Sequence, residues 1–256
     1  MIDIHSHLLP GLDDGAQSEQ ETIELARNAV ADGIHTVIAT PHHANGHFLN
    51  NKQKVLEAVE ACNALLKRHG IPLTVLPGQE IRIHDQWLDE WAQDQLLDLA
   101  SSGYVLMEFP FSHMPSYTLD LIHELAIRGW KPVIAHPERN RELAGEPEKL
   151  LDLIDSGALV QVTSHSVMGT FGRTVQKLSL DWIARRMVHL IASDAHHAVK
   201  RPFALREAYR IIEHKVGRSL AEELKANAEK LISRQPIEIP EPLPKKKRFW
   251  SWKISR

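Results

Sequence analysis

The sequence lacks the features that mark membrane and secreted proteins. Its 256 residues contain no run of about 18 apolar residues, so no membrane-spanning helix is expected. The first residues have neither the basic nor the apolar region of a signal peptide. Cys62 is the only cysteine, which excludes a disulfide within the chain. Together these absences predict a cytoplasmic protein.

Acidic and basic residues are distributed unevenly along the chain. The formal net charge is -3, yet residues 245–256 contain six basic residues and no acid, which leaves -9 for residues 1–244. An acidic body of this kind repels the phosphate backbone and argues against nucleic acid as a partner. The length suits one large α/β barrel domain or two smaller domains.

Short apolar, β-branched runs alternate with amphipathic helical patterns. The patterns predict strands at 2–4, 36–39, 73–76, 104–107, 132–135, 159–162 and 189–192, and helices near 18–33, 52–69, 117–128, 146–156, 174–186, 203–216 and 220–233. A capping box at residues 18–21 opens the first of these helices. The alternation indicates an α/β fold with a parallel sheet, most naturally a TIM-like (β/α)7 barrel. An open doubly wound sheet is the alternative.

Histidines and acidic residues gather at the carboxyl ends of the predicted strands. His5 and His7 lie two residues apart on an extended segment, so both imidazoles point to the same side and can reach one ion. The other candidates are Asp13 or Asp14 in the loop after the first strand, and His42, Glu80, Glu108, His136, Asp194 and His196 after later strands. Because parallel strands of a barrel end on one face, these groups are expected to converge. Imidazole and carboxylate without thiolate suit Mn, Fe, Zn or Mg and argue against a structural zinc site.

The order of these motifs resembles the PHP (polymerase and histidinol phosphatase) superfamily. The resemblance rests on Asp-Ile-His-Ser-His at residues 3–7, Thr-Pro-His at 40–42, Gly-Gln-Glu at 78–80, His-Pro-Glu-Arg at 136–139 and Ser-Asp-Ala-His at 193–196. Each motif alone is unspecific, but their combination is specific and extends from residue 1 to about 233. Within the superfamily, the sequence is most similar to the bacterial manganese-dependent tyrosine phosphatases that accompany capsule and exopolysaccharide synthesis.

The resemblance implies a distorted barrel that holds two to three metal ions, with Mn as the expected metal. It assigns one ion to His5, His7, Glu80 and Asp194, and a second ion to Glu80, Glu108 and His136. The resemblance assigns a third ion to Asp14, His42 and His196, with Asp13 as the alternative to Asp14. No expected ligand position is lost, so the resemblance implies an active enzyme.

The expected reaction is hydrolysis of a phosphomonoester. Clustered divalent cations lower the pKa of a bridging water, supply hydroxide at neutral pH and bind the phosphoryl oxygens. Arg139 and Arg201 lie shortly after His136 and His196, so each could place its planar guanidinium on two phosphate oxygens. The alternative for both arginines is a surface position or pairing with a ligand carboxylate. Five residues of nearby loops could border the substrate: His43, His47, Phe48, His113 and Tyr117.

Three functions are compatible with these features. The resemblance favours a protein-tyrosine phosphatase that acts on the tail of a bacterial tyrosine kinase. A small-molecule phosphatase of the histidinol phosphate type would have the same metal site, with different residues around the substrate. A metal-stabilised regulatory binding module is the third possibility, disfavoured by the complete ligand set. Cys62 and Arg68 fit the pattern of cysteine-dependent phosphatases, but Cys62 lies inside an amphipathic helix and is predicted to be a core residue.

The chain is expected to divide near residue 234. Residues 1–234 form the predicted barrel domain, and the proline-containing residues 235–244 form an extended linker. Residues 245–256 combine lysines and arginines with Phe249, Trp250 and Trp252, a composition that can adsorb to an anionic membrane surface. An acidic partner or a solvated chain end is the alternative, and the sequence predicts no oligomeric state.

Overall fold

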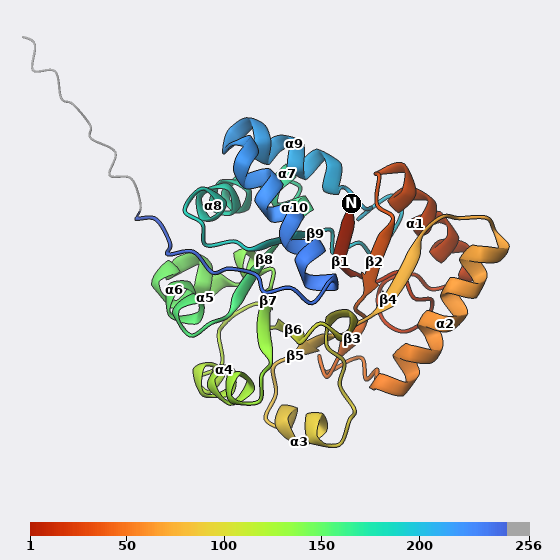
Figure 1. The fold of residues 1–256 in the computed structure, drawn as a ribbon, viewed down its shortest axis with the longest axis horizontal. Coiled ribbons are helices and arrows are strands. Elements are labelled where there is room, and N and C mark those ends of the chain that lie inside the picture. The colour runs from red at the N-terminus through yellow and green to blue at the C-terminus, as the bar shows by residue number, and fades with distance from the viewer. Residues whose placement is uncertain (245–256) are drawn as a thin grey trace, which may run out of the picture.

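The computed structural model describes residues 1–244, in which parallel strands are surrounded by helices (Figure 1). The strands form one sheet of order β1-β2-β4 and another of order β3-β5-β6-β7-β8-β9, with every pairing parallel. Their bounds are β1 Ile2–Ser6, β2 Thr36–Ala39, β3 His42–His43, β4 Thr74–Pro77, β5 Glu80–Arg82, β6 Tyr104–Glu108, β7 Lys131–Ala135, β8 Leu159–Thr163 and β9 Leu190–Ala192. The predicted parallel α/β class is therefore confirmed.

All seven predicted helices are present within two or three residues of their expected bounds. The α-helices are α1 Glu19–Ala31, α2 Lys52–Arg68, α3 Trp87–Ala92, α4 Thr118–Ile127, α5 Arg141–Gly145, α6 Pro147–Asp155, α7 Ser164–Met168, α8 Arg173–Ala184, α9 Leu205–Lys215 and α10 Arg218–Ile232. Two short 3-10 helices, Leu99–Ser101 and Pro137–Arg139, complete the described elements. Ser18 caps α1 by accepting a hydrogen bond from the Glu21 N–H. The Glu21 carboxylate accepts from the Gln17 N–H, so the reciprocal bond of a capping box is shifted by one residue.

Two predicted strands, β2 and β4, are each followed by a short strand that the sequence did not predict. Thr40 and Pro41 separate β2 from β3, and Gly78 and Gln79 separate β4 from β5. A side chain at Gly78 would place its Cβ 2.7 Å from Ile38 Cγ2, so only glycine allows the two segments to pass this closely. As a result His42 and Glu80 open new short strands and pair side by side, rather than lying in loops after strands.

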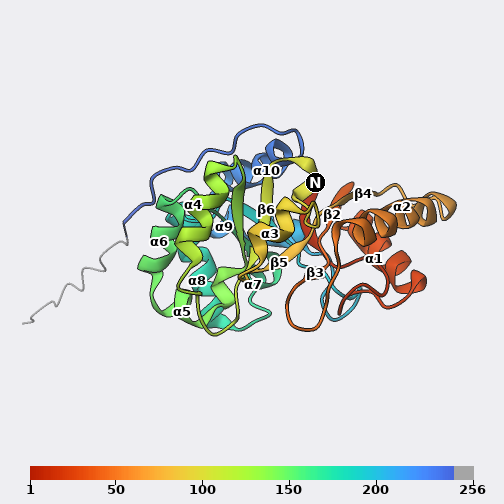
Figure 2. The same ribbon diagram turned by 90° about the horizontal axis from the view of Figure 1, so that it is seen from below.

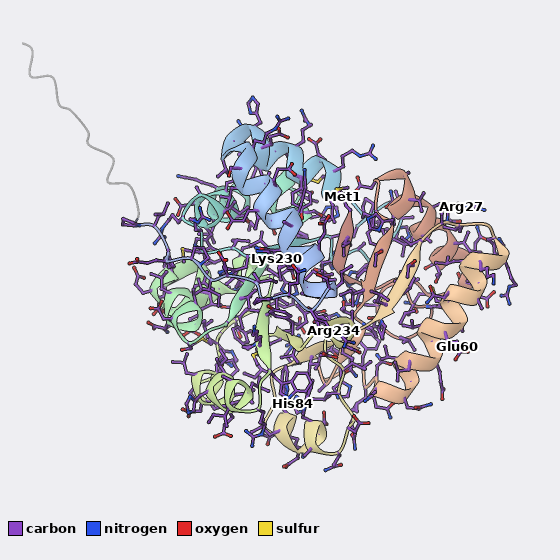
Figure 3. All side chains as sticks on the ribbon, viewed as in Figure 1. Met1, Arg27, Glu60, His84, Lys230 and Arg234 are labelled. Carbon is purple, nitrogen blue, oxygen red and sulfur yellow. The ribbon has the colours of Figure 1, made fainter. Side chains whose placement is uncertain are left out.

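The carboxyl end of β1 lies beside the segment that follows β9. Ser6 and Ala195 form a parallel bridge, the His7 N–H donates to the Ala195 carbonyl (2.8 Å), and the Asp194 N–H donates to the His5 carbonyl (2.9 Å). An inner cluster of buried apolar side chains draws on β1, β2, β6, β7, β8 and β9, among them Ile4, Ile38, Leu106, Val133 and Leu190. A larger cluster packs the outer faces of the strands against the helices, and side chains fill the space between them (Figure 3). Cys62 is buried in this outer cluster, as predicted.

Residues 235–244 form no helix or strand, but they are bound to the body of the protein. Figure 2 shows α10 and the segment that follows it along one side of the molecule. The Ile237 N–H donates to the Tyr104 hydroxyl (2.9 Å), and Ile237 is buried in the inner cluster at the amino ends of the strands. Farther along, Leu243 and Arg185 exchange two hydrogen bonds.

The predicted membrane-binding tail, residues 245–256, lies outside the described residues. Among residues 1–244, no helix combines the length and the apolar character that crossing a bilayer requires.

Candidate metal centre

All nine predicted metal-ligating residues meet at the carboxyl ends of the strands. Candidate ligand atoms form three overlapping groups, and within each group they lie within 4.8 Å of one another: His5, His7, Glu80 and Asp194; His7, Asp14, His42 and His196; and His42, Glu80 and Glu108. The first group equals the set that the resemblance implied. The third contains His42 where His136 was expected, but His136 Nε2 lies 2.7 Å from Glu80 Oε1 and borders the same group.

The first group has the donor arrangement of a cation site. His5 Nε2 and His7 Nε2 are 3.2 Å apart, and each lies 3.2–3.4 Å from Glu80 Oε2 and Asp194 Oδ1. All four side chains are buried. Two imidazole nitrogens and two carboxylate oxygens buried this close together need a shared positive charge between them. The residues present therefore fit a divalent metal of the kind that accepts mixed nitrogen and oxygen ligands.

The outward nitrogens of the same two imidazoles are held by polar side chains behind them. His5 Nδ1 lies 3.0 Å from Gln161 Oε1, and His7 Nδ1 lies 2.6 Å from Asp13 Oδ2. Donation of the Nδ1–H to these oxygens leaves each Nε2 unprotonated and directed at the group. Sequence reasoning missed the role of Gln161, although a polar residue in the middle of a fully buried strand was a signal for it.

The structure distinguishes the two adjacent aspartates. Asp13 is buried behind His7 and also accepts from the backbone N–H groups of Gly15 and His42. Asp14 is more exposed, and its Oδ1 lies 3.4 Å from both His42 Nε2 and His196 Nε2. Asp14 is thus the aspartate that faces the cluster, whereas Asp13 orients His7.

Burial and nearby charges shift the pKa values of the cluster residues, in opposite directions at Glu80 and in the same direction at His136 and His196. Burial alone would raise the pKa of Glu80, but His5 and His42 hold it well below its ordinary value. Burial, followed by the nearby Arg139, lowers the pKa of His136 to about 4. Burial also lowers the pKa of His196, and His7 adds to the effect. His136 and His196 are therefore neutral at pH 7, the form in which an imidazole binds a metal.

Two of the nine residues adopt the left-handed backbone conformation that favours glycine. His136 has φ 35° and ψ 51°, and Asp194 has φ 55°. Such conformations cost on the order of 1–3 kcal/mol each and persist only where surrounding contacts hold them. Here the His136 carbonyl accepts from the Arg139 N–H (3.1 Å), and Asp194 is bound through its N–H to β1. The strain turns both side chains toward the cluster instead of along the chain.

Both predicted arginines reach the cluster, where they pair with one of its carboxylates. Arg139 Nη1 lies 2.9 Å from Asp194 Oδ2, and Arg201 Nη2 donates to the same oxygen. Burial alone would raise the pKa of Asp194, but Arg201 and His5 hold it well below its ordinary range. Asp194 thus faces the histidines with Oδ1 and the arginines with Oδ2.

A hollow of about 370 Å³ opens above the cluster. Its lining combines six of the candidate ligands and both arginines with Asn45, His47, Phe48, Arg82 and Phe111. His47 and Phe48 therefore border the site as expected. His43 does not, because it is buried with its Nε2 2.9 Å from Glu90 Oε2, and Tyr117 lines a separate hollow. His113 is exposed outside the lining.

Sequence reasoning missed Arg82, which lies in the short strand β5. Its Nε is 2.9 Å from Glu108 Oε2, and its side chain lines the hollow. Burial, followed by Glu80, raises the pKa of Glu108, and Arg82 opposes that rise.

The sequence model of the CpsB/CapC family of capsular polysaccharide synthesis matches residues 1–233. The chain belongs to this family. Tyrosine-protein phosphatase YwqE of Bacillus subtilis, a relative, is 45% identical over 251 residues, which cover 97% of this chain and 99% of the relative. Tyrosine-protein phosphatase CpsB of Streptococcus pneumoniae is 30% identical over 243 residues, which cover 93% and 100% of the two chains. The match to the CpsB/CapC family includes every candidate ligand and both arginines.

Solved structures agree with the CpsB/CapC assignment. One of the crystal structures of YwqE from B. subtilis and CpsB from S. pneumoniae matches this chain with a TM-score of 0.93. Those two proteins are metal-dependent tyrosine phosphatases. The matched structure is 45% identical and covers 96% of this chain and 100% of its own. A phosphotriesterase homology protein of Escherichia coli shares the fold, with a TM-score of 0.56 at 12% identity over 90% of this chain and 98% of its own.

Proposed function

We propose that this protein is a metal-dependent phosphomonoester hydrolase, and specifically a protein-tyrosine phosphatase that acts on a bacterial tyrosine kinase of capsule or exopolysaccharide synthesis. One observation carries the proposal: three overlapping groups of imidazoles and carboxylates, all buried except Asp14, lie beneath a hollow that Arg139 and Arg201 line. The curated names of the relatives in B. subtilis and S. pneumoniae support the choice of phosphotyrosine over other esters.

The three groups would hold two to three divalent ions, with Mn as our first choice and Fe, Zn or Mg as alternatives. His5, His7, Glu80 and Asp194 would hold one ion, Glu80 and Glu108 with His42 or His136 a second, and Asp14, His42 and His196 a third. Bound ions would lower the pKa of coordinated water and neutralise charge on the phosphoryl oxygens.

The arginines would bind and orient the phosphoryl group. Each guanidinium has five N–H donors, so the bond to Asp194 leaves donors on Arg139 and Arg201 for phosphate oxygens. Fixed positive groups at the phosphoryl oxygens supply most of what phosphoryl transfer requires from a protein. A phenolate leaving group has a pKa of about 10, so phosphotyrosine needs little help from a general acid.

We further propose that the strands close into a distorted (β/α)7 barrel. In this arrangement β2 with β3 and β4 with β5 each act as one bent strand, and the bridge between Ser6 and Ala195 joins the two sheets. The shared inner cluster supports closure, since side chains fill the interior of such barrels. Residues 1–234 would form this domain, with residues 235–256 as its C-terminal extension.

The test of function begins with protein purified without chelator, whose metals are counted. Turnover of a phosphotyrosine peptide is then measured before and after EDTA, and again after Mn is added back. We expect two to three ions, loss of activity with EDTA and recovery with Mn. Histidinol phosphate is assayed in parallel, because faster turnover of this ester would favour the small-molecule alternative. Metal-free protein with EDTA-insensitive activity would refute the proposed mechanism.

We also propose that residues 245–256 bring a cytoplasmic enzyme to the anionic surface of the membrane, near its kinase. The proposal rests on the basic and aromatic composition of this tail. Full-length protein and a variant that ends at residue 244 are compared in cosedimentation with vesicles of anionic lipid. We expect the shorter variant to bind less, and equal binding by the two proteins would contradict the proposal.

A further inference from the structure

Arg139, which lines the hollow, has its guanidinium over two phenyl rings. Its guanidinium carbon is 5.2 Å from the ring centre of Phe111 and 4.9 Å from that of Phe171. Arg201 approaches the ring of Phe171 as well, at 5.9 Å. All three distances are within the range of about 6 Å in which an aromatic face attracts a cation.

Each ring is fixed by its own local structure. Phe171 lies in the turn between α7 and α8, where Gly169 (φ 88°) and Gly172 (φ 96°) both need the left-handed conformation. Its ring also lies beside that of His165, with the ring centres 6.2 Å apart. This turn directs a large apolar side chain back toward the metal-centre face.

Phe111 is also held by its neighbours. Its carbonyl accepts from the Arg141 N–H (2.9 Å), which ties the loop after β6 to the start of α5. Its ring stacks beside the imidazole of His136, with centres 6.4 Å apart and planes 20° apart. Both rings are therefore held by contacts within the protein itself.

Both phenyl rings are more exposed to solvent than the arginine side chain that they contact. Phe111 is 50% exposed and Phe171 is 37% exposed, whereas the side chain of Arg139, which contacts both rings, is 18% exposed. The two faces of a guanidinium cannot form hydrogen bonds, and all of its N–H donors lie in its plane. Rings that cover the faces leave the in-plane donors free for Asp194 and for a phosphoryl group.

We propose that Phe111 and Phe171 are positioning residues that clamp Arg139 for phosphate binding. The inference rests on the proposed function only in that Arg139 binds phosphate. Without the clamp, the single contact with Asp194 would leave the guanidinium free to rotate out of the hollow. The clamp thus fixes the geometry of the arginine without touching the reacting atoms.

The test uses inorganic phosphate and metal-loaded full-length protein, with binding measured by calorimetry. Phe111→Leu and Phe171→Leu keep an apolar side chain but remove the ring, and we expect each to weaken phosphate binding about threefold to thirtyfold. Phe111→Tyr and Phe171→Tyr keep the ring and should restore most of the affinity. In an Arg139→Ala background the same leucine substitutions should have no further effect.

Tyr117→Leu is the matched control. Tyr117 lies in the same connection after β6, is 38% exposed, forms no cation–π pair within the described residues and lines a separate hollow, so phosphate affinity should not change. Metal content and melting temperature are recorded for every variant. Equal losses in the leucine and tyrosine variants, or losses that persist without Arg139, would overturn the inference, as would a wild-type protein that binds no phosphate. Because binding needs no turnover, a protein that binds phosphate through the clamp but hydrolyses no phosphotyrosine would contradict only the proposed function.

Discussion

Buried histidines occur at both ends of the strands, and their surroundings differ. At the carboxyl ends, His5 and His7 face the carboxylate of Glu80. Burial would lower the pKa of both, but nearby carboxylates raise it, first Glu80 for His5 and first Asp13 for His7. At the amino end of β9, His189 is equally buried but meets no carboxylate in the described part of the chain. Its Nδ1 accepts from the Val160 N–H (3.0 Å), and burial lowers its pKa to about 4. Burial alone therefore does not mark a candidate ligand, whereas a group of several imidazoles and carboxylates that face one another does.

The largest effect is expected from Glu80→Gln, which removes the carboxylate shared by two candidate groups. The amide keeps the shape of the side chain but not its charge, so the facing imidazoles lose the partner that a shared cation requires. We expect a loss of turnover on the order of 10³-fold and a lower metal count. Atomic absorption and phosphotyrosine peptide assays measure these two quantities.

Glu90→Gln is the control for this change. Glu90 Oε2 also lies near two histidines, 2.9 Å from His43 Nε2 and 3.2 Å from His84 Nε2, but this trio lies outside the three groups. The control should therefore keep its full metal content. Similar metal loss in both variants would remove the distinction between ligand and structural carboxylates.

Arg139→Ala should lower kcat/KM about 100-fold without loss of metal, because one charge-assisted pair of bonds to the phosphoryl group is removed. Arg139→Lys should recover little activity, since an ammonium is a point charge without the planar pair of donors. Arg186→Ala, which breaks a pair with Glu223 far from the hollow, serves as the control. Metal loss in Arg139→Ala would mean that the arginine supports the ligands instead of the substrate.

His189→Gln tests the amino end of the strands through stability. The imidazole gains its proton below pH 6.5 in the unfolded chain but only near pH 4 in the folded one, so protonation favours unfolding as the pH falls between these values. We expect wild-type protein to lose about 2 kcal/mol more stability than His189→Gln between pH 7.5 and pH 5. Urea unfolding at the two pH values measures the difference. Turnover at pH 7 should be equal in both proteins, and parallel pH profiles of stability would contradict the expectation.

The smallest effect is expected from Asp13→Asn, which acts behind His7. The amide can still accept from the His42 N–H, but it no longer supplies a charged acceptor for His7 Nδ1. We expect the apparent Kd for Mn to rise roughly tenfold, the lower end of the range for residues that orient a ligand. Metal titration of the chelator-treated protein measures it. An unchanged Kd would show that the orientation of His7 does not depend on Asp13.

The positions of the candidate ligands were predictable because strand periodicity and parallel topology determine where strands end. Period-two and helical patterns located the long elements, so residues as distant as His5 and His196 could be expected on one face. The short strands β3 and β5 were not predicted, because segments of two or three residues are too short to show a periodic pattern. The break at Gly78 depends on a close approach between strands that no local pattern encodes.

Side-chain geometry was the part that the sequence did not reveal. Asp13 and Asp14 are neighbours in a loop, and only the folded chain turns one behind His7 and the other toward the hollow. Gln161 and Arg82 belong to no motif, and their partners lie more than twenty residues away along the chain. The pairing of both arginines with Asp194 likewise depends on how two separate loops meet.

The two oxygens of Asp194 have a consequence for how the site responds to its occupants. Because Oδ1 faces the histidines and Oδ2 faces Arg139 and Arg201, one carboxylate takes part in both halves of the site. An occupant on either side changes the electron density that this carboxylate offers to the other side. Thermodynamic linkage then makes the effect mutual. If a bound cation changes the affinity for an oxyanion by some factor, the bound oxyanion changes the affinity for that cation by the same factor.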